Sequence, residues 1–148
     1  MTKASYGKRV VALLLDWLFA VVPPLVVLVI GIAMVFSDST AGIGILFILI
    51  GSLGWIVLSI WNKVFKEGRT GQSFGKARMN ISLVDANTGQ PIGAGRAFLR
   101  EFIFSLLSSF TAGVFWLVDY LWPLWDKNGE RLMDKIMTSR VVTSQPVL

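Results

Sequence analysis

The chain has 148 residues, of which 54% are hydrophobic and only 16% charged, and it carries a net charge of +5 at pH 7. A soluble domain averages about 25% charged residues, so this composition indicates a membrane protein, and the length suits a single domain. The sequence has no Cys and no His, which excludes disulfides, thiol chemistry, and the commonest metal ligand and neutral-pH base. The basic residues fall between apolar stretches, a distribution that favours anionic lipid over nucleic acid as their partner.

The first apolar stretch predicts a transmembrane helix over residues 10–36. From Trp17 to Phe36, twenty residues contain no Asp, Glu, Lys or Arg. At about 1.5 Å per residue they span the roughly 30 Å hydrocarbon core of a bilayer. The stretch is too long for the apolar region of a signal peptide, so we expect no cleaved leader. Pro23 and Pro24 predict a kink near residues 21–22.

Asp16 lies at the start of this stretch and is the strongest candidate for a functional residue. It follows Arg9 by seven residues, about two helical turns, so both side chains project from one helix face. A carboxylate in the bilayer costs a few kcal/mol unless a partner offsets that cost. Asp16 is therefore either a cation or proton site, or a structural anchor paired with Arg9, Lys76, Arg96 or Arg100.

A polar turn at residues 37–40 leads to a second predicted transmembrane helix over residues 41–61. Glycines in this helix are small enough to let a neighbouring helix approach closely, as is common in membrane bundles. They are Gly42, Gly44, Gly51 and Gly54.

Residues 62–101 form the longest polar segment and contain seven basic residues, whereas the 37–40 turn contains none. The positive-inside rule therefore places this segment and the N-terminus in the cytoplasm. Within it, alternating apolar residues predict a strand over 77–84, a turn at 85–91 and a return strand beginning at Ile92. Together these would make a small cytoplasmic β-hairpin.

Arg96 and Arg100 end this polar segment and lie four residues apart, so they share a helix face. Two interpretations fit this spacing. The pair anchors the chain at the lipid headgroups, or it pairs with Asp16 or Asp134 across the protein.

The stretch from residue 102 to 125 is apolar apart from Asp119 and allows two topologies. A single span would carry the basic C-terminal tail outside, against the positive-inside rule. A break at residues 108–113 would instead make a re-entrant helical hairpin, whose turn must be buried in protein, and would return the tail to the cytoplasm. We favour the hairpin. Asp119 is either a second polar site or a residue that reaches the headgroup region.

Residues 126–137 alternate charged and apolar side chains and predict an interfacial C-terminal helix. We therefore expect an all-α membrane protein with two full transmembrane helices and a third apolar segment, accompanied by the small β-hairpin and this interfacial helix. The apolar face of the interfacial helix comprises Leu132, Met133, Ile136 and Met137.

No arrangement of residues predicts catalysis. The segment Gly71-Gln-Ser-Phe-Gly75-Lys76 has Thr70 where a P-loop has its first Gly, and Ala77 where it has Ser or Thr. It therefore predicts a tight turn with close backbone approach. No nucleophile is paired with a base and no cluster has metal-ligand spacing, so we expect a protein that is not an enzyme, with no metal and no cofactor.

In combination these residues resemble the RDD family of small bacterial membrane proteins, which is named for one Arg and two Asp. The named residues correspond to Arg9, Asp16 and Asp134. The segment 71–76 and the spacing of Arg96 and Arg100 are also similar to the family pattern.

Two features depart from that pattern. Residues 138–142 resemble the family's closing Thr-x-Val-Val motif but carry one extra residue, and Met133 stands where the family usually has His. The resemblance covers residues 6–142, so the whole chain, 1–148, is expected to be one domain.

The resemblance implies a multi-pass protein of the bacterial inner membrane. Transport has been proposed for the family, and sodium/proton antiport is reported for some members. It also implies that Arg9, Asp16 and Asp134 matter for function, without assigning a chemical step to each.

Two functional hypotheses follow. The first is cation (sodium)/proton exchange, with Asp16 as the exchanging carboxylate, Arg9 and Asp134 tuning it, and a homo-oligomer enclosing the pathway. The alternative is a structural or accessory subunit of a larger membrane assembly. The expected charge partners are Lys76, Arg96, Arg100 and Asp119, and the expected surroundings are the bilayer and anionic lipid at the cytoplasmic face.

Overall fold

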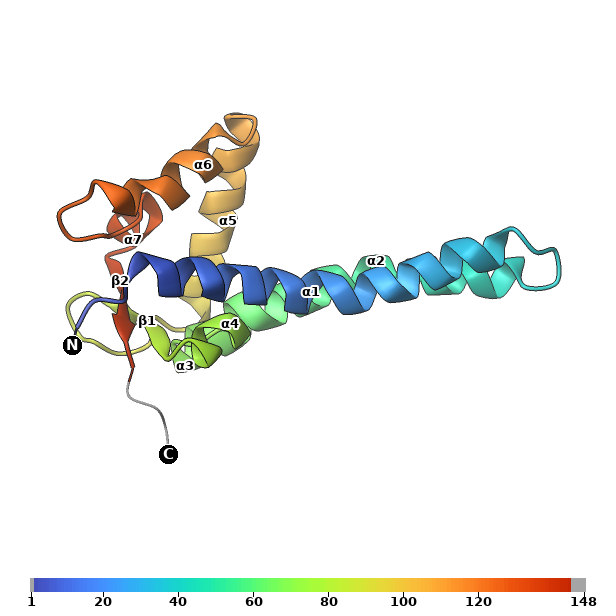
Figure 1. Cartoon of the computed structure of the whole chain (residues 1–148), viewed down its shortest axis with the longest axis horizontal. Helices are drawn as coiled ribbons and strands as arrows, with labels where there is room; N and C mark the ends of the chain where they lie inside the picture. Colours follow the sequence, from blue (N-terminus) through green and yellow to red (C-terminus); the bar gives the residue numbers. More distant parts are fainter. Residues whose placement is uncertain (1, 145–148) are drawn as a thin grey trace.

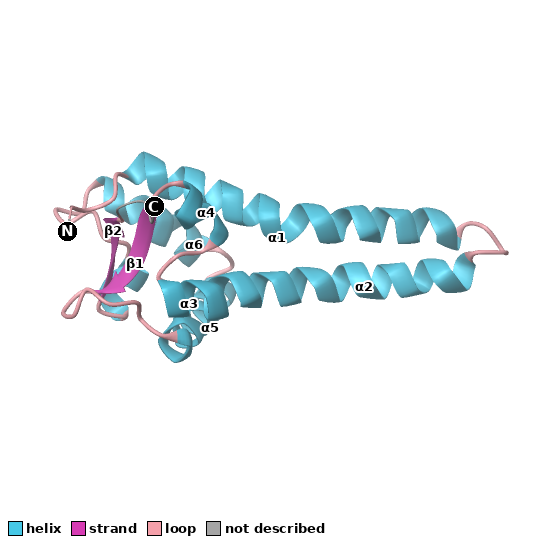
Figure 2. Ribbon diagram, turned by 90° about the horizontal axis from the view of Figure 1, so that it is seen from below, coloured by secondary structure: helices cyan, strands magenta, loops and turns pink. Residues whose placement is uncertain are grey.

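The computed structural model describes residues 2–144. Two long antiparallel helices, α1 (Tyr6–Val35) and α2 (Ala41–Ile60), extend as a hairpin from a smaller base that holds the rest of the chain (Figure 1). Figure 2 shows the two helices side by side along their length, joined at the far end by a short turn. The remaining elements are η1 (Trp61–Lys66, a π-helix), α3 (Glu67–Thr70), α4 (Phe74–Arg78), β1 (Ile81–Asp85), α5 (Ala94–Phe110), α6 (Val114–Leu121), η2 (Trp122–Leu124), α7 (Leu132–Ile136) and β2 (Ser139–Thr143).

The two predicted long apolar helices are present. The first covers Tyr6–Val35 and the second is continuous from Ala41 to Thr70, and each is long and apolar enough to cross a membrane. Only 17% and 11% of their most apolar windows are buried. The helices therefore present their apolar side chains outward, which suits contact with lipid rather than a place in a soluble core.

Close packing between α1 and α2 depends on two of the four expected glycines, Gly44 and Gly51, whereas nothing lies within 4 Å of a Cβ atom on Gly42 and Gly54 has only ordinary contacts. A Cβ atom on Gly44 would lie 2.7 Å from the carbonyl oxygen of Gly31, and one on Gly51 would lie 2.8 Å from the carbonyl oxygen of Pro24. Side chains at these positions would force the helices apart. Pro24 is buried in this contact, and α1 remains one helix through Pro23 and Pro24.

The predicted β-hairpin is wrong. β1 pairs antiparallel with β2 in the register Ile81↔Thr143 to Asp85↔Ser139, and only an isolated bridge, Val84↔Pro91, joins β1 to the expected return strand. All five β1 residues are buried. Along its other edge β1 contacts the backbone of Gly71, whose carbonyl accepts from Leu83 N–H at 2.7 Å. The strand partner is distant in the chain, and local alternation of apolar residues does not identify it.

Residues 102–125 form a helical hairpin, so a single continuous helix here is wrong. α5 ends at Phe110, residues 111–113 turn, and α6 returns toward the base. The expected burial of this turn in protein is wrong, because residues 109–112 are exposed and Phe110 is 81% exposed. The hairpin lies across the direction of α1 rather than alongside it (Figure 1), and Figure 2 shows α5 nearly end-on.

The predicted interfacial C-terminal helix is also wrong in its surroundings. α7 has only five residues, and Met133 and Asp134 within it are completely buried. Of the predicted apolar face, Ile136 is exposed. One face of the helix, with Met133 and Asp134, is held against the base by the buried contacts of Asp134 described below, while Lys135 and Ile136 are exposed.

Candidate functional site

Asp16 is buried and its carboxylate is fully surrounded by hydrogen-bond donors. Oδ1 accepts from Asn62 Nδ2 at 2.8 Å and from the backbone N–H of Gly75 at 2.7 Å. Oδ2 accepts from Ser73 Oγ at 2.6 Å and lies 3.4 Å from Lys63 Nζ. The predicted pairing of Asp16 with Arg9, Lys76, Arg96 or Arg100 is therefore wrong.

The segment 71–76, which superficially resembled a phosphate-binding loop, supplies two of these donors, Ser73 Oγ and Gly75 N–H. Ser73 caps the N-terminus of α4, where its Oγ accepts from Lys76 N–H at 3.3 Å. Gly75 packs so tightly on α1 that a Cβ atom there would lie 1.9 Å from the Ala12 carbonyl oxygen. The expected close backbone approach is thus confirmed, and it brings a backbone N–H onto the carboxylate one turn further along α1.

Asn62 is the main residue of the site that the sequence did not predict. Its Oδ1 accepts from Phe74 N–H at 2.7 Å while its Nδ2 donates to Asp16, so it joins α1 to α4. Asn62 is 1% exposed and lies in the π-helical turn η1. Such turns insert an extra residue in a helix and occur frequently at functional sites. The one sequence feature that could have identified Asn62 is its position as a single amide directly after the apolar stretch 41–61.

Asp134 binds two arginines, Arg100 and Arg9, of which only Arg100 was among its predicted partners. Arg100 donates to Oδ1 at 2.7 Å, Arg9 lies 3.6 Å from Oδ2, and the backbone N–H of Arg131 donates to Oδ2 at 3.1 Å. The expected pairing of Arg100 with Asp134 is confirmed. Arg9 also donates to the carbonyl oxygens of Gly129 and Val141 at 2.8 and 3.0 Å.

Asp119 forms a third buried pair, with Arg131, so it lies inside the base. Arg131 Nε donates to Oδ2 at 2.7 Å, and Met133 N–H donates to Oδ1 at 2.8 Å. The guanidinium lies 3.7 Å from the ring centre of Tyr120, a cation–π contact. Burial alone would lower the pKa of Arg131, but the negative groups beside it, Asp119 among them, raise it.

The other predicted charge partners pair elsewhere. Lys76 forms an ion pair with Glu67, and burial lowers the pKa of Lys76 although Glu67 opposes that shift. Arg96 pairs with Asp85 and donates to the carbonyl oxygen of Met137. The contact with Arg96, followed by the N–H groups of the next turn, holds the pKa of Asp85 well below its usual range.

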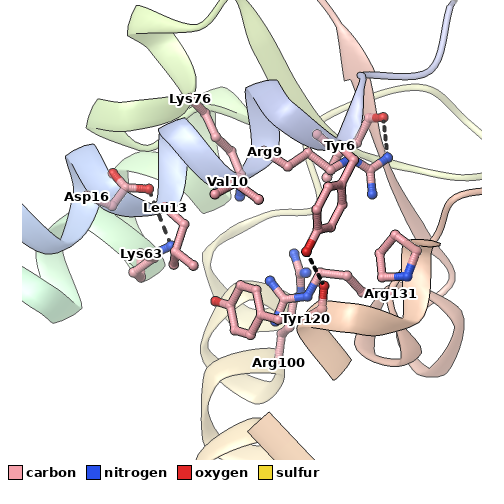
Figure 3. Close-up of a pocket in the computed structure, with 12 residues that line it drawn as sticks. Tyr6, Arg9, Val10, Leu13, Asp16, Lys63, Lys76, Arg100, Tyr120 and Arg131 are labelled. Atoms are coloured by element: carbon pink, nitrogen blue, oxygen red, sulfur yellow. Dashed lines mark hydrogen bonds and ion pairs between the residues drawn. The ribbon is translucent and has the colours of Figure 1, made fainter. Parts of the chain in front are cut away.

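These groups lie together where α1 enters the base, and we call them the charged layer. Six of these groups line a cavity of about 40 Å³, large enough for roughly one water molecule (Figure 3). Five cations but only the Asp16 carboxylate line that cavity, so its wall disfavours a metal cation. Among residues 2–144, no group of three or more His, Cys, Asp and Glu residues could hold a metal ion. The charged layer comprises Arg9, Asp16, Lys63, Glu67, Lys76, Arg100, Asp119, Arg131 and Asp134.

Comparison with known proteins agrees with the resemblance in the sequence. A family model described as the RDD family matches residues 3–138. A protein of Mycobacterium leprae (strain TN) named "Proline-rich antigen" is 37% identical over 103 residues, which cover 70% of this chain and 39% of that protein. The "Proline-rich antigen homolog" of Mycobacterium tuberculosis strain H37Rv is 36% identical over 88 residues, covering 60% and 35% respectively. The chain thus spans well under half the length of these relatives, and no solved structure matches it.

Proposed function

The chain belongs to the RDD family, and on that premise we propose that it is a non-catalytic membrane module, an accessory or anchoring subunit of a larger assembly. In this proposal α1 and α2 cross the bilayer. The charged layer then locks the base to the cytoplasmic end of the helical pair and presents it to a partner.

The main support for this proposal is that the hydrogen-bond acceptor positions of the Asp16 carboxylate are already occupied. Two carboxylate oxygens offer about four acceptor positions, and Asp16 uses them for three hydrogen bonds and the contact with Lys63. A sodium ion or an added proton would have to displace a donor that the protein already supplies. An arrangement filled in this way supports a structural lock more strongly than a site of exchange.

The proposed position of α1 in the membrane follows from its uncharged stretch. The uncharged residues 17–36 fill the hydrocarbon core, and Arg9, eight residues before Trp17, lies about 12 Å outside it along the helix. The basic residues of the base would then face the anionic lipid of the cytoplasmic leaflet. We propose a multi-pass protein of the bacterial inner membrane with a cytoplasmic N-terminus.

The α5–α6 hairpin would enter one leaflet only. Large apolar side chains on both helices are exposed, yet the hairpin lies across the axis of α1 (Figure 1). That orientation supports an element immersed at the interface rather than a third span. The exposed residues include Phe98, Phe102, Phe110, Val114, Leu117 and Leu121.

Partners within the membrane would be another membrane subunit or a second copy of the chain. An apolar groove runs between α1 and α2 beside Gly51 and is lined by Val21, Leu25, Leu28 and Trp55. In the mycobacterial relatives the matched region is only 39% and 35% of the protein. A module joined to other sequence in this way fits an anchoring role.

Cation/proton exchange is the second candidate. The observation that favours it is the cavity that reaches Asp16 and Lys63, because a water molecule there could carry a proton to the carboxylate. Exchange would then require Asp16 to release Lys63 or one of its other donors.

Proton movement in proteoliposomes tests the proposal against this alternative. The protein is reconstituted at a defined orientation, a pH gradient is imposed, and sodium is added outside. The anchoring proposal expects the gradient to decay at the rate of protein-free vesicles. Sodium-dependent decay in wild type that Asp16→Asn abolishes, with both proteins folded, would favour exchange.

A further inference from the structure

A second hollow, separate from the cavity of the charged layer, opens on the base. It has a volume of about 290 Å³ and a predominantly polar wall. Its lining comes from three regions far apart in the sequence: the N-terminal region with the first turn of α1, the loop between η2 and α7, and β2. We call it the basic groove, and its polar residues are Lys3, Arg9, Lys127, Asn128, Glu130 and Arg140.

The N-terminal wall of the groove is fixed to β2. Lys3 forms an antiparallel bridge with Val142, and Ala4 N–H donates to the Val141 carbonyl oxygen at 3.1 Å. Alternate residues of a strand share a face, so Arg140 lies on the same face as Val142, diagonal to Lys3. Backbone pairing therefore holds two cationic residues on one side of the groove.

The opposite wall is a hydrogen-bonded turn. Asp126 Oδ2 accepts from the N–H groups of Asn128 and Glu130 at 3.1 and 2.9 Å, and Arg9 donates to the Gly129 carbonyl oxygen at 2.8 Å. These contacts fix the backbone on both sides of Lys127. The cationic side chains are thus placed by ordered segments rather than by a free tail.

The charges of the groove differ from those of the charged layer. Every cation of the charged layer faces a carboxylate, whereas within residues 2–144 no ion pair is made by Lys3, Lys127 or Arg140. Arg9 is already bound to Asp134 and two carbonyl oxygens. Glu130 is the one carboxylate in the lining. Three uncommitted cations against one carboxylate create an attraction for a dianion.

We propose that the basic groove binds a phosphomonoester or inorganic phosphate, with Arg140 as a two-pronged donor and Lys3 and Lys127 as point charges. The groove is larger than a phosphate group, which leaves room for an attached organic portion. Arg9 lies about 12 Å beyond Trp17 along α1, so the groove opens a few ångströms outside the headgroup layer, which extends about 5–7 Å beyond the hydrocarbon core. The phosphate can come from a lipid headgroup or from a soluble compound, and the site does not depend on the anchoring function.

Calorimetric titration of the full chain in phosphatidylcholine nanodiscs, at low ionic strength, tests the site. One arm titrates inorganic phosphate and the other dihexanoyl phosphatidic acid, with dihexanoyl phosphatidylcholine as the neutral control. The test variant is Lys127→Gln/Arg140→Gln, which changes two exposed residues. The matched control is Lys8→Gln/Arg69→Gln, which removes the same charge outside the groove.

We expect saturable binding that the groove variant weakens at least tenfold and the control changes less than twofold. If inorganic phosphate and dihexanoyl phosphatidic acid both bind in this way, the phosphate group itself is the ligand. If only phosphatidic acid does, the ligand is a lipid headgroup. Equal weakening by both double variants would show only a general field of positive charge and would overturn the site. Absence of saturable binding in both arms would overturn it as well.

Discussion

The carboxylate of Asp16 and the backbone N–H of Gly75 are 2.7 Å apart although 59 residues separate them in the chain. This contact joins the first long apolar helix, α1, to the segment that follows the second, α2. It exists because residue 75 has no side chain, which lets α4 rest directly on the backbone of α1.

A side chain at residue 75 should therefore be incompatible with the fold. In Gly75→Ala the new Cβ would meet the Ala12 carbonyl oxygen at 1.9 Å, so we expect either no folded protein or a loss of more than about 3 kcal/mol in the free energy of unfolding. Thermal unfolding in detergent measures the change. Gly95→Ala is the control, because nothing lies within 4 Å of a Cβ there. Equal stability of the two variants would show that α4 does not rest on α1 as described.

The ion pair between Arg100 and Asp134 should be strongly coupled to stability. Their side chains are 6% and 0% exposed, and loss of Arg100 leaves the buried Asp134 with Arg9, 3.6 Å away, as its remaining cationic partner. Arg100→Gln should cost about 2–3 kcal/mol in the free energy of unfolding. In a double-mutant cycle, Arg100→Gln with Asp134→Asn should cost clearly less than the sum of the single changes. Additive costs would mean that the two side chains do not interact.

Stability should fall in acid partly because of Asp85. Its pKa is lowered in the folded protein by Arg96 and the following turn, so the folded state binds fewer protons than the unfolded state below about pH 4. The stabilisation is complete above that pH and is lost as the pH falls toward the folded pKa. Thermal unfolding of Arg96→Gln between pH 3 and 7 should show a weaker dependence on pH than wild type. Arg69→Gln is the control and should keep the pH dependence of wild type. If Arg96→Gln also keeps it, Asp85 does not contribute to the loss of stability in acid.

The positions of the two hairpins can be tested by labelling, because the natural chain has no Cys. Ser39→Cys, in the turn between α1 and α2, should react with a membrane-impermeant maleimide only from the periplasmic side. Lys127→Cys should react only from the cytoplasmic side, because the α5–α6 hairpin returns the chain to the face that it left. Labelling of both positions from the periplasm would contradict an interfacial hairpin and require a third span.

Local patterns were sufficient to predict the helices but not their partners. The uncharged run from Trp17 to Phe36 and the glycines of α2 predicted a packed pair of apolar helices, because hydrophobicity and residue size are properties of each segment. The partner of β1 could not be predicted in this way. It lies more than fifty residues away in β2, and the nearby Ile92 offered a shorter connection.

In the charged layer too, local patterns did not predict which residues pair. Arg9, Asp16 and Asp134 lie in one region of the structure, but helical spacing made Arg9 a candidate partner for Asp16. In the structure Arg9 turns to Asp134, and Asp16 is held by an amide, a hydroxyl and a backbone N–H that carry no charge. Uncharged donors give little signal in a sequence, so Asn62 and Ser73 were not identified.

The free energy of unfolding of Asp16→Asn tests the central claim, that Asp16 is a structural lock, most directly. The new side-chain NH₂ would face the groups that donate to Asp16 in wild type, and Lys63 would lose its carboxylate partner at this position. We therefore expect the free energy of unfolding to fall by roughly 3 kcal/mol. Asp38→Asn, at an exposed position in the distal turn, should change stability by less than about 0.5 kcal/mol. An Asp16→Asn protein as stable as wild type would contradict the claim, and it would leave ion exchange as the better explanation of a buried carboxylate in this helix.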